Sequence, residues 1–312
     1  MVVPTVGASE LLLPCLEALR ADLAGRGRLV VVAQGARLAP ALRREVSRLA
    51  DSLIELPAAV GFAVANNRGW AAEAAAGEAA EWLGTVNDDA VIEPGWTVAL
   101  LAALAADASL AAVQGVNLRR AEPARVDGCG ISWNRVWQAV QVGDGGPPPS
   151  GAAPRGDIFG ASATAAIYRR SALDQVALAA GDYFEPRLGT YYEDVELAVR
   201  LRAAGWRAAL VPAARCRHAG SLSGSRQPVE RASLLYRNRL LVLARLLGRR
   251  FPLALPRVLW RDLRDLAGGL RRGDVATAAG ILRGWGRAAR ALGGFLHAGP
   301  PGVPLAGLRE EG

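Results

Sequence analysis

Two adjacent carboxylates, Asp88 and Asp89, follow Asn87 at the end of a short apolar run. Neighbouring carboxylates repel each other unless a cation or hydrogen-bond donors lie between them. A hard divalent cation with oxygen ligands, itself bound to phosphate, would meet that need. The alternative interpretation is a solvated turn, in which an aspartate caps the helix expected after Pro94.

A second pair of carboxylates, Glu193 and Asp194, stands in the first turn of an amphipathic helix predicted over residues 193–204, which Gly205 would end. A carboxylate held in a pocket beside an acceptor hydroxyl can act as a general base. Acidic residues are also common at helix N-termini, where they interact favourably with the helix dipole. The pair therefore has a catalytic and a structural interpretation.

Two further segments could supply ligands. Residues 61–69 read Gly-Phe-Ala-Val-Ala-Asn-Asn-Arg-Gly, in which glycine and asparagine would let backbone and amide groups approach a nucleotide. The same segment could be a loop before a helix, with Phe62 anchored in the core. His218 follows an apolar run over residues 208–211 and could complete a metal site with the aspartates, although a lone histidine is more often structural.

The pattern of hydrophobic residues predicts a scaffold that would position these groups. Over the first 115 residues, short apolar runs alternate with helix-like stretches, which predicts βαβ units and a largely parallel sheet. Ligands of such sheets bind beyond the carboxyl ends of the strands, which is where Asp88 and Asp89 stand. Strands are expected over residues 2–4, 29–33, 52–56 and 82–87, and helices over residues 10–23, 40–49 and 62–80.

The composition indicates a folded protein with a large core. The chain has 312 residues, of which 51% are hydrophobic and 21% charged, and this apolar content excludes general disorder. The longest apolar stretch, residues 98–106, is much shorter than the roughly 20 residues of a membrane-spanning helix. The N-terminal residues lack the basic and apolar regions of a secretory signal. Cys15, Cys129 and Cys216 are far apart, which predicts reduced thiols in the cytoplasm.

The formal net charge of +8 comes almost entirely from one segment. Lysine is absent, and residues 1–244 hold 25 Arg against 24 acidic residues. Residues 245–290 hold 11 Arg against three Asp. The basic character therefore belongs to a C-terminal segment and not to the body of the protein.

Two amphipathic helices are predicted in this basic segment, one over residues 255–270 and one that begins after an Asp274 cap. Basic amphipathic helices beside a nearly neutral body predict binding to an anionic membrane surface. The alternative is that both helices pack against the body and keep a solvated arginine face. No nucleic-acid partner is predicted, because no nucleic-acid-binding motif accompanies the arginines. The expected apolar membrane anchors are Trp260, Trp285 and Phe295.

Taken in order, these motifs resemble glycosyltransferase family 2, and the resemblance covers about residues 2–247. Members of its rhamnosyltransferase-like branch commonly show Gly-Phe-Ala-x-x-Asn-Asn-x-Gly followed by Asn-Asp-Asp, as residues 61–69 and 87–89 do here. The rest of the ordered set consists of Pro-Thr at 4–5, Gly-Ala-Ser at 160–162, Tyr-Tyr-Glu-Asp-Val-Glu-Leu at 191–197 and His-Ala-Gly-Ser at 218–221.

The resemblance implies a GT-A fold, an α/β architecture with a mostly parallel central sheet flanked by helices. It implies a catalytic domain over residues 1–247, with a nucleotide-binding half over 1–115 and an acceptor-binding half over 116–247, followed by a basic helical tail over 248–312. The implied activity is transfer of a sugar, rhamnose or another hexose, from a nucleotide-sugar donor to a saccharide or lipid-linked acceptor. The implied cofactor is a divalent metal, Mg²⁺ or Mn²⁺, and the implied setting is cell-envelope polysaccharide synthesis at the inner face of the plasma membrane.

The resemblance also implies roles for individual residues. Asp89 and His218 would bind the metal, Asp194 would be the catalytic base, and Glu193 would be the acid before it. Asp194 would take the proton of an acceptor hydroxyl in one inverting displacement, which needs no covalent intermediate. The positions that match the nucleotide-sugar site are Pro4, Thr5, Gln34, Asn67, Asn87, Asp88, Gly160, Ala161 and Ser162.

The second predicted strand departs from the family pattern. Family members usually end it with an aspartate that contacts the base of the nucleotide, but Ala33 stands there in this chain and Gln34 follows it. Gln34 is the candidate to contact the base instead. The missing carboxylate favours an alternative function, that of a catalytically silent relative that binds nucleotide sugars or acts as a scaffold at the membrane. The presence of both Asp89 and Asp194 favours catalysis.

Overall fold

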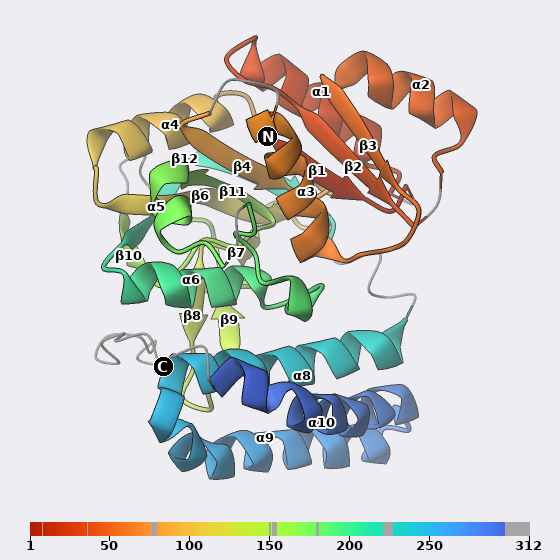
Figure 1. The fold of residues 1–312 in the computed structure, drawn as a ribbon, viewed down its shortest axis with the longest axis vertical. Coiled ribbons are helices and arrows are strands. Elements are labelled where there is room, and N and C mark those ends of the chain that lie inside the picture. The colour runs from red at the N-terminus through yellow and green to blue at the C-terminus, as the bar shows by residue number, and fades with distance from the viewer. Residues whose placement is uncertain are drawn as a thin grey trace.

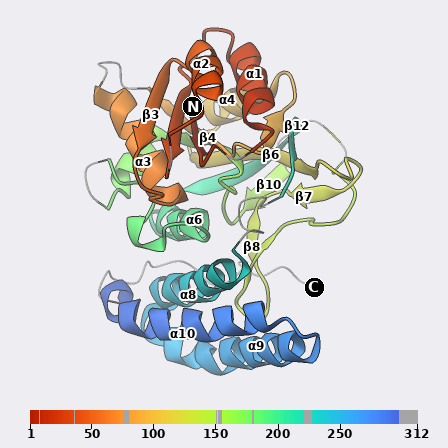
Figure 2. The same ribbon diagram turned by 90° about the vertical axis from the view of Figure 1, so that its right-hand side faces the viewer.

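An α/β body lies above a layer of three long helices in this computed structural model (Figures 1 and 2). The body contains a ten-stranded mixed sheet with helices on both faces. The helical layer is formed by residues 228–296. The structure describes residues 1–7, 9–35, 37–75, 80–149, 151, 155–178, 181–220 and 227–296.

The first part of the sheet is parallel, and its strands lie in the order β4-β1-β2-β3. The apolar runs form these strands because both faces of the sheet are covered by helices. The predicted alternation of strands and helices is confirmed. The first helix begins at Leu12, two residues later than predicted, and residues 76–79 of the third predicted helix lie outside the described residues. The elements are β1 (Val2–Thr5), α1 (Leu12–Leu23), β2 (Val30–Gln34), α2 (Pro40–Leu49), β3 (Ser52–Leu56), α3 (Phe62–Ala75) and β4 (Trp82–Val86).

The second part of the sheet is mixed. β11 runs antiparallel between β4 and β6, and β12 runs parallel to β6 on the other side. Strands β8 and β9 form a separate hairpin that points toward the helical layer (Figure 1). The elements are β5 (Ala90–Ile92), α4 (Trp96–Ala106), β6 (Leu110–Arg119), β7 (Val126–Gly128), β8 (Ile131–Trp133), β9 (Ala139–Gln141), β10 (Arg155–Ile158), β11 (Ala165–Arg169), α5 (Arg170–Gln175), the short 3-10 helix η1 (Pro186–Leu188), α6 (Glu193–Ala203) and β12 (Arg207–His218).

Strand β12 is longer than the sequence predicts. The apolar run over residues 208–211 is only its first part, and its pairing with β6 is irregular between Leu210 and Arg215 before it resumes. Gly115 on β6 permits this irregularity, because a Cβ there would lie 2.2 Å from the carbonyl oxygen of Ala214. His218, expected just after a strand, is therefore the last residue of β12 itself.

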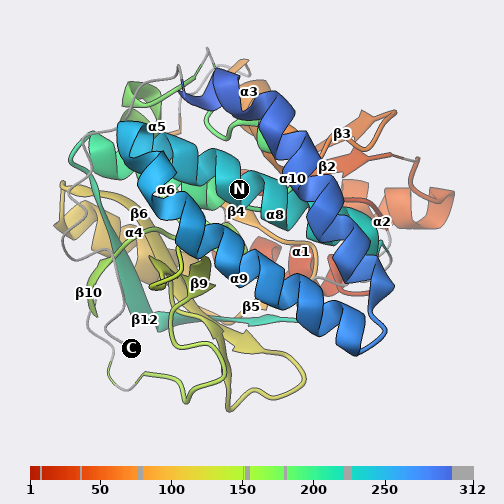
Figure 3. The ribbon, with the colours of Figure 1, turned by 90° about the horizontal axis from the view of Figure 1, so that it is seen from below.

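The helical layer consists of α8 (Pro228–Leu247), α9 (Phe251–Arg271) and α10 (Val275–Leu296), with a short 3-10 helix, η2 (Gly248–Arg250), before α9 (Figure 3). The two helices predicted in the basic segment are present. Asp274 caps the second as predicted, because its Oδ1 accepts a hydrogen bond of 3.0 Å from the Thr277 N–H.

Helix α10 packs closely on α8 because two of its residues have no side chain. A Cβ on Gly280 would lie 2.5 Å from the Cβ of Ala232, and one on Gly284 would lie 2.8 Å from the carbonyl oxygen of Ser233. Any larger residue at either position would push the two helices apart.

A buried polar cluster joins all three helices of the layer. Arg239 of α8 forms an ion pair with Asp262 of α9, and the indole N–H of Trp285 on α10 donates to the other oxygen of Asp262 at 2.9 Å. Phe295, also on α10, is fully buried. The prediction that Trp285 and Phe295 are membrane anchors is therefore wrong, because the apolar stripe that contains them faces α8 and the body. Trp260 alone of the three is exposed, at 64%.

Candidate active site

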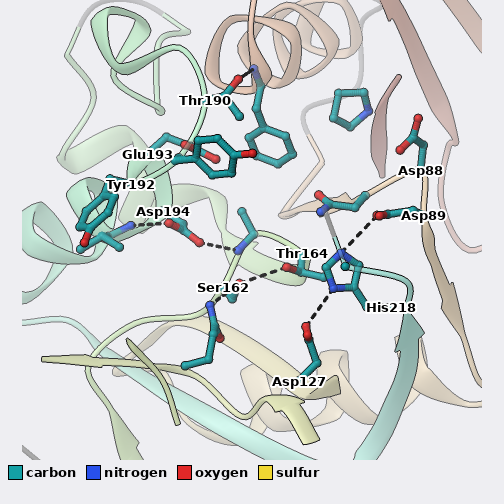
Figure 4. Close-up of a pocket in the computed structure, with 18 of the residues that line it drawn as sticks. Asp88, Asp89, Asp127, Ser162, Thr164, Thr190, Tyr192, Glu193, Asp194 and His218 are labelled. Carbon is teal, nitrogen blue, oxygen red and sulfur yellow. Dashed lines mark hydrogen bonds and ion pairs between the residues drawn. The ribbon is translucent and has the colours of Figure 1, made fainter. Parts of the chain in front are cut away.

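A cavity of about 720 Å³ opens at the carboxyl ends of β1, β2 and β4 and extends to α6 and α8 (Figure 4). Residues that are far apart in the sequence line it together, as expected for strand ends that meet at one edge of a parallel sheet. The predicted site residues that line it are Pro4, Thr5, Gln34, Asn87, Asp88, Asp89, Ser162, Glu193, Asp194 and His218.

Asp88 is fixed by the end of the neighbouring strand. The hydroxyl of Thr5 on β1 donates to Asp88 Oδ2 at 2.5 Å, and the Gly7 N–H donates to the same hydroxyl oxygen at 2.8 Å. Burial raises the pKa of Asp88 to about 6, the hydrogen bond from Thr5 opposes this shift, and the charge of Asp89 adds to it. The two aspartates are thus held together and poorly solvated, an arrangement that a divalent cation would stabilise.

His218 lies between two carboxylates. Its Nδ1 is 2.8 Å from Asp127 Oδ2 and its Nε2 is 3.2 Å from Asp89 Oδ1 (Figure 4). Burial alone would lower the pKa of His218, but its contacts with Asp127 and Asp89 outweigh burial and raise that pKa to about 9. The bond to Asp127 fixes the orientation of the ring, which is the usual arrangement behind a metal-ligating histidine.

The residues at this end of the cavity fit a divalent ion that is shared with a bound diphosphate. Nε2 of His218 is buried and has no well-aligned hydrogen-bond partner, and the same holds for Oδ1 of Asn87. Among the described residues, no group of three or more carboxylate, thiol or imidazole side chains is arranged to hold a metal ion alone. Asp89 and His218 would therefore supply part of the shell, and phosphate oxygens the rest, as is common for Mg²⁺.

The second carboxylate pair lies across the cavity at the start of α6 (Figure 4). The two residues before it, Tyr191 and Tyr192, have left-handed backbones with φ of 71° and 69°. This conformation costs roughly 1–2 kcal/mol for each residue with a side chain. Asp194 is held by backbone donors, since its Oδ2 accepts from the Ala163 N–H at 3.1 Å and its Oδ1 from the Val195 N–H at 2.8 Å.

Burial raises the pKa of both carboxyl groups at this end of the cavity. The pKa of Glu193 is raised further by the charge of Asp194, while hydrogen bonds from Ala163 and Val195 oppose the shift at Asp194. Glu193 Oε2 is buried and has no hydrogen-bond partner. A carboxylate with a raised pKa binds a proton more strongly than an ordinary aspartate, which suits a general base that works near neutral pH.

The Gly-Phe loop and the loop before α6 are in direct contact. A Cβ on Gly61, whose φ is +88°, would lie 2.8 Å from the carbonyl carbon of Gly189, so only glycine fits. The Ala63 N–H donates to the Gly189 carbonyl at 2.9 Å, and the Phe62 N–H donates to Thr190 Oγ1 at 3.2 Å. Two segments about 130 residues apart in the sequence are thereby packed into one wall of the site.

Gln34 stabilises the same wall. Its Oε1 accepts hydrogen bonds of 2.9 Å from the N–H groups of both Val60 and Gly61. This oxygen is therefore engaged by the Gly-Phe loop, although the side chain also lines the cavity. Its predicted contact with the nucleotide base would have to use the amide nitrogen.

Three predicted donor-binding residues do not line the cavity. The side chain of Asn67 is buried and joins α3 to residues 183–184, because it donates to the Phe184 carbonyl at 2.8 Å and accepts from the Tyr183 and Phe184 N–H groups. Gly160 and Ala161 lie beneath α6, where a Cβ on Gly160 would lie 2.4 Å from that of Ala198. These three residues support the walls of the site and do not line the cavity, although direct contact with the nucleotide sugar was expected for them.

The lining residues that sequence reasoning missed include Asp127, Thr164, Arg231 and Leu235. Asp127 stands alone in the short strand β7, and no neighbouring motif marks it. Arg231 and Leu235 belong to α8 and are four residues apart, a spacing that places both on one side of the helix. That spacing was visible in the sequence, but nothing there shows that this side of α8 faces the site.

Comparison with known proteins agrees with this architecture. The model of the family described as "Glycosyltransferase like family 2" matches residues 1–238. No curated protein sequence matches the chain at a significant level.

Two solved structures are similar in fold. One is GalNAc-T7 with UDP, GalNAc and Mn²⁺, at a TM-score of 0.60 and 12% identity over 79% of this chain and 47% of that chain, so this chain spans about half its length. Another is the mannosyltransferase PcManGT from Pyrobaculum calidifontis in complex with GDP-Man and Mn²⁺, at a TM-score of 0.53 and 20% identity over 95% of this chain and 84% of that chain. These similarities confirm the predicted GT-A type of fold.

Proposed function

The chain belongs to the glycosyltransferase-like family 2, and from that membership we propose that it transfers a hexose from a nucleotide-sugar donor to a hydroxyl of a saccharide or lipid-linked acceptor. One observation supports this proposal above all others. Asp89 with His218 and Glu193 with Asp194 come from β12, α6 and the end of β4, yet they line a single cavity. That cavity therefore offers both a place for a diphosphate and a base for an acceptor.

At the diphosphate end of the cavity, Asp89 and His218 would hold a divalent ion, Mg²⁺ or Mn²⁺. Such an ion neutralises the charge that develops on a departing nucleoside diphosphate. Asp127 keeps Nε2 of His218 directed at the site through its contact with Nδ1. Thr5 holds Asp88 beside Asp89, so that both carboxylates stay in position when no ligand is bound.

At the other end, Asp194 would accept the proton of the acceptor hydroxyl as that oxygen attacks the anomeric carbon. One bond forms from the acceptor oxygen to carbon while the bond from carbon to the phosphate oxygen breaks, so the configuration inverts and no covalent enzyme intermediate is needed. Glu193, whose pKa is raised by burial and by Asp194, would carry a proton to a higher pH than an ordinary glutamate does. A protonated Glu193 would spare the buried site a second negative charge.

The test is release of nucleoside diphosphate by the purified full chain, with UDP- and GDP-sugars and Mg²⁺ or Mn²⁺. Turnover that Asp194→Asn abolishes would support the proposal. If the wild-type chain is stabilised against heat by a donor but releases no diphosphate with any acceptor, the chain is instead a silent nucleotide-sugar-binding relative.

We also propose that the helical layer binds an anionic membrane surface, on the inner face of the plasma membrane, where lipid-linked acceptors and cell-envelope polysaccharide synthesis would be located. No helix in the described part of the chain is long and apolar enough to span a bilayer. Helix α9, however, exposes an apolar row to solvent. This outer row consists of Leu253, Trp260, Leu263 and Leu270, whose spacings of seven, three and seven residues place them on one side of the helix.

The charges around the outer row fit an anionic partner. Arg257, Arg264 and Arg271 border it and form no ion pair within the described residues. The acidic residues of α9 are engaged elsewhere, Asp262 with Arg239 and Asp265 with Arg261. Each arginine near an anionic surface contributes roughly 1 kcal/mol, and the apolar row would add burial at the interface.

Flotation with liposomes tests this part of the proposal. Full-length protein should bind vesicles that contain phosphatidylglycerol more tightly than neutral ones, and high salt should weaken the binding. Equal and negligible binding to both would contradict it. A concentration-dependent dimer in sedimentation that is lost when the outer row is made polar would show that a second copy covers this face instead.

A further inference from the structure

We propose that Asn238, on α8, is a positioning residue for catalysis. It would hold the loop of residues 188–192, which precedes Glu193 and Asp194 and sets their direction. The helical layer would then be part of the catalytic machinery and not only a means of attachment. This inference rests on the proposed function, because Asp194 is the base there.

The contacts of Asn238 are all with that loop. Its side chain is fully buried, and its Nδ2 lies 3.0 Å from the carbonyl oxygens of Leu188 and Thr190 and 2.7 Å from that of Tyr191. Three backbone carbonyls thus share the two N–H groups of a single side chain. Since buried carbonyls need hydrogen-bond partners, removal of this amide would take away the donor to the Thr190 and Tyr191 carbonyls, whereas the Leu188 carbonyl also accepts from the Thr190 N–H at 3.0 Å.

The loop needs such support because of its backbone. Gly189, Tyr191 and Tyr192 all have positive φ, and Tyr192 is the residue from which α6 starts, without a side-chain cap. Residues with side chains keep this conformation only where their surroundings impose it. The direction in which Glu193 and Asp194 point depends on this turn, because they are the first two residues of the helix.

Helix α8 also forms hydrogen bonds and ion pairs with the chain on either side of the loop. Arg237 donates to the Arg187 carbonyl before it. Arg245, which is buried, forms ion pairs with Glu185 before the loop and with Glu196 after it. Glu196 is two residues beyond Asp194, so the same helix fixes the loop at its entry, along its length and at its exit.

Asn238 lies on the side of α8 that reaches the cavity. Arg231 and Leu235 line the cavity from the same helix. Positions 231, 235 and 238 follow the four-and-three spacing of one helix face. The face that closes the site is therefore also the face that holds its loop.

The experiment compares Asn238→Ala with a matched control, Ser233→Ala. Ser233 is also buried on α8, but its hydroxyl accepts a hydrogen bond from Arg287 of α10 at 3.1 Å, away from the loop. Asn238→Ala should lower kcat by about 10²-fold, the size expected when a reacting group is misplaced by about 1 Å, and should leave the KM for the donor nearly unchanged. Amide hydrogen exchange should rise in peptides covering residues 186–194. Ser233→Ala should leave both kcat and the hydrogen exchange of residues 186–194 unchanged. The two variants are compared at similar losses of melting temperature.

Two outcomes would overturn the positioning role. In one, both variants lose kcat in proportion to their loss of stability, which would make Asn238 an ordinary structural residue. In the other, hydrogen exchange over residues 186–194 is unchanged in Asn238→Ala. The exchange measurement needs no turnover, so it decides the matter even if the wild-type chain proves inactive and the proposed function fails.

Discussion

The body and the helical layer of this protein place their charges in opposite directions. In the body, five carboxylates face the cavity, and Arg231 is the only arginine among the described residues that lines it. In the layer, Asp262 is turned inward onto Arg239, while arginines such as Arg257 and Arg264 face solvent. Inward carboxylates indicate a cationic or proton-bearing ligand, and outward arginines indicate an anionic surface. The nearly neutral net charge of the body therefore conceals a cavity lined by five carboxylates.

The largest expected effect is on the cavity. Asp194→Asn is nearly isosteric but accepts no proton, so kcat should fall on the order of 10²–10⁴-fold while donor affinity persists. Diphosphate release and donor titration measure the two quantities. Liposome binding by the same variant should stay at the wild-type level, because the helical layer is untouched. Equal losses of donor binding and turnover would instead make Asp194 a binding or structural residue.

The next effect concerns the buried ion pair of the layer. Asp262→Asn leaves the charge of Arg239 buried without a partner and should lower the free energy of unfolding by about 3–5 kcal/mol, as measured by urea denaturation. The matched control is Asp265→Asn, which loses a partly exposed pair with Arg261 and should cost less than about 1 kcal/mol. Similar losses of unfolding free energy in both variants would show that the buried pair of Asp262 and Arg239 contributes no more to stability than an exposed pair does.

A smaller effect is expected at the outer row. Trp260→Glu places a negative charge and removes an indole where the membrane would lie, so affinity for acidic liposomes should fall by about tenfold or more. Turnover with a water-soluble acceptor should not change, because Trp260 is exposed and lies outside the cavity. If Trp260→Glu binds acidic liposomes as tightly as the wild type does, the outer row does not contact the membrane.

The smallest effect is a shift of the pH profile. Because burial raises the pKa of Asp194, its basic form appears only above the usual range of an aspartate, near pH 4, and kcat should fall already at mildly acidic pH. Glu193→Gln imitates a protonated Glu193, whose pKa is raised by burial and by Asp194, and should leave this acidic limb nearly unmoved. The sign for stability is opposite, since ionising a buried carboxyl with a raised pKa destabilises the fold as pH rises through that pKa. Profiles of kcat and of melting temperature against pH test both statements.

The parallel part of the body could be predicted well because each of its strands and helices is marked by residues that are close together in the sequence. A buried strand needs only a short apolar run, and the ends of such strands meet at one edge, which is why Asp88 and Asp89 were found. Asp127 and the true length of β12 were beyond such reasoning. Both depend on how β6 pairs with β7 and β12, and the irregular pairing with β12 requires a residue without a side chain at Gly115.

In the layer, the sequence predicted the helices but not their orientation. The period of the hydrophobic residues locates an apolar stripe, and α9 and α10 each have one side buried and further apolar residues exposed. Which side is buried depends on α8, through contacts such as those of Gly280 and Gly284 with its backbone. The hydrophobic period alone therefore does not show that Trp285 packs inward and donates to Asp262, and no pattern in the sequence marks Asn238.

The exposure of Trp260 also makes the protein its own spectroscopic probe. All eight tryptophans lie in described residues, and Trp260 is the only one with an exposed side chain, so quenching by acrylamide or iodide should act mainly on its emission. Transfer of that indole from water to a lipid interface would shift the emission to shorter wavelength without any label. All three cysteines are buried, so a single thiol introduced at Leu253 would be the one position that reacts readily with a maleimide dye. Depth and orientation at a bilayer could then be measured from two points on the same helix.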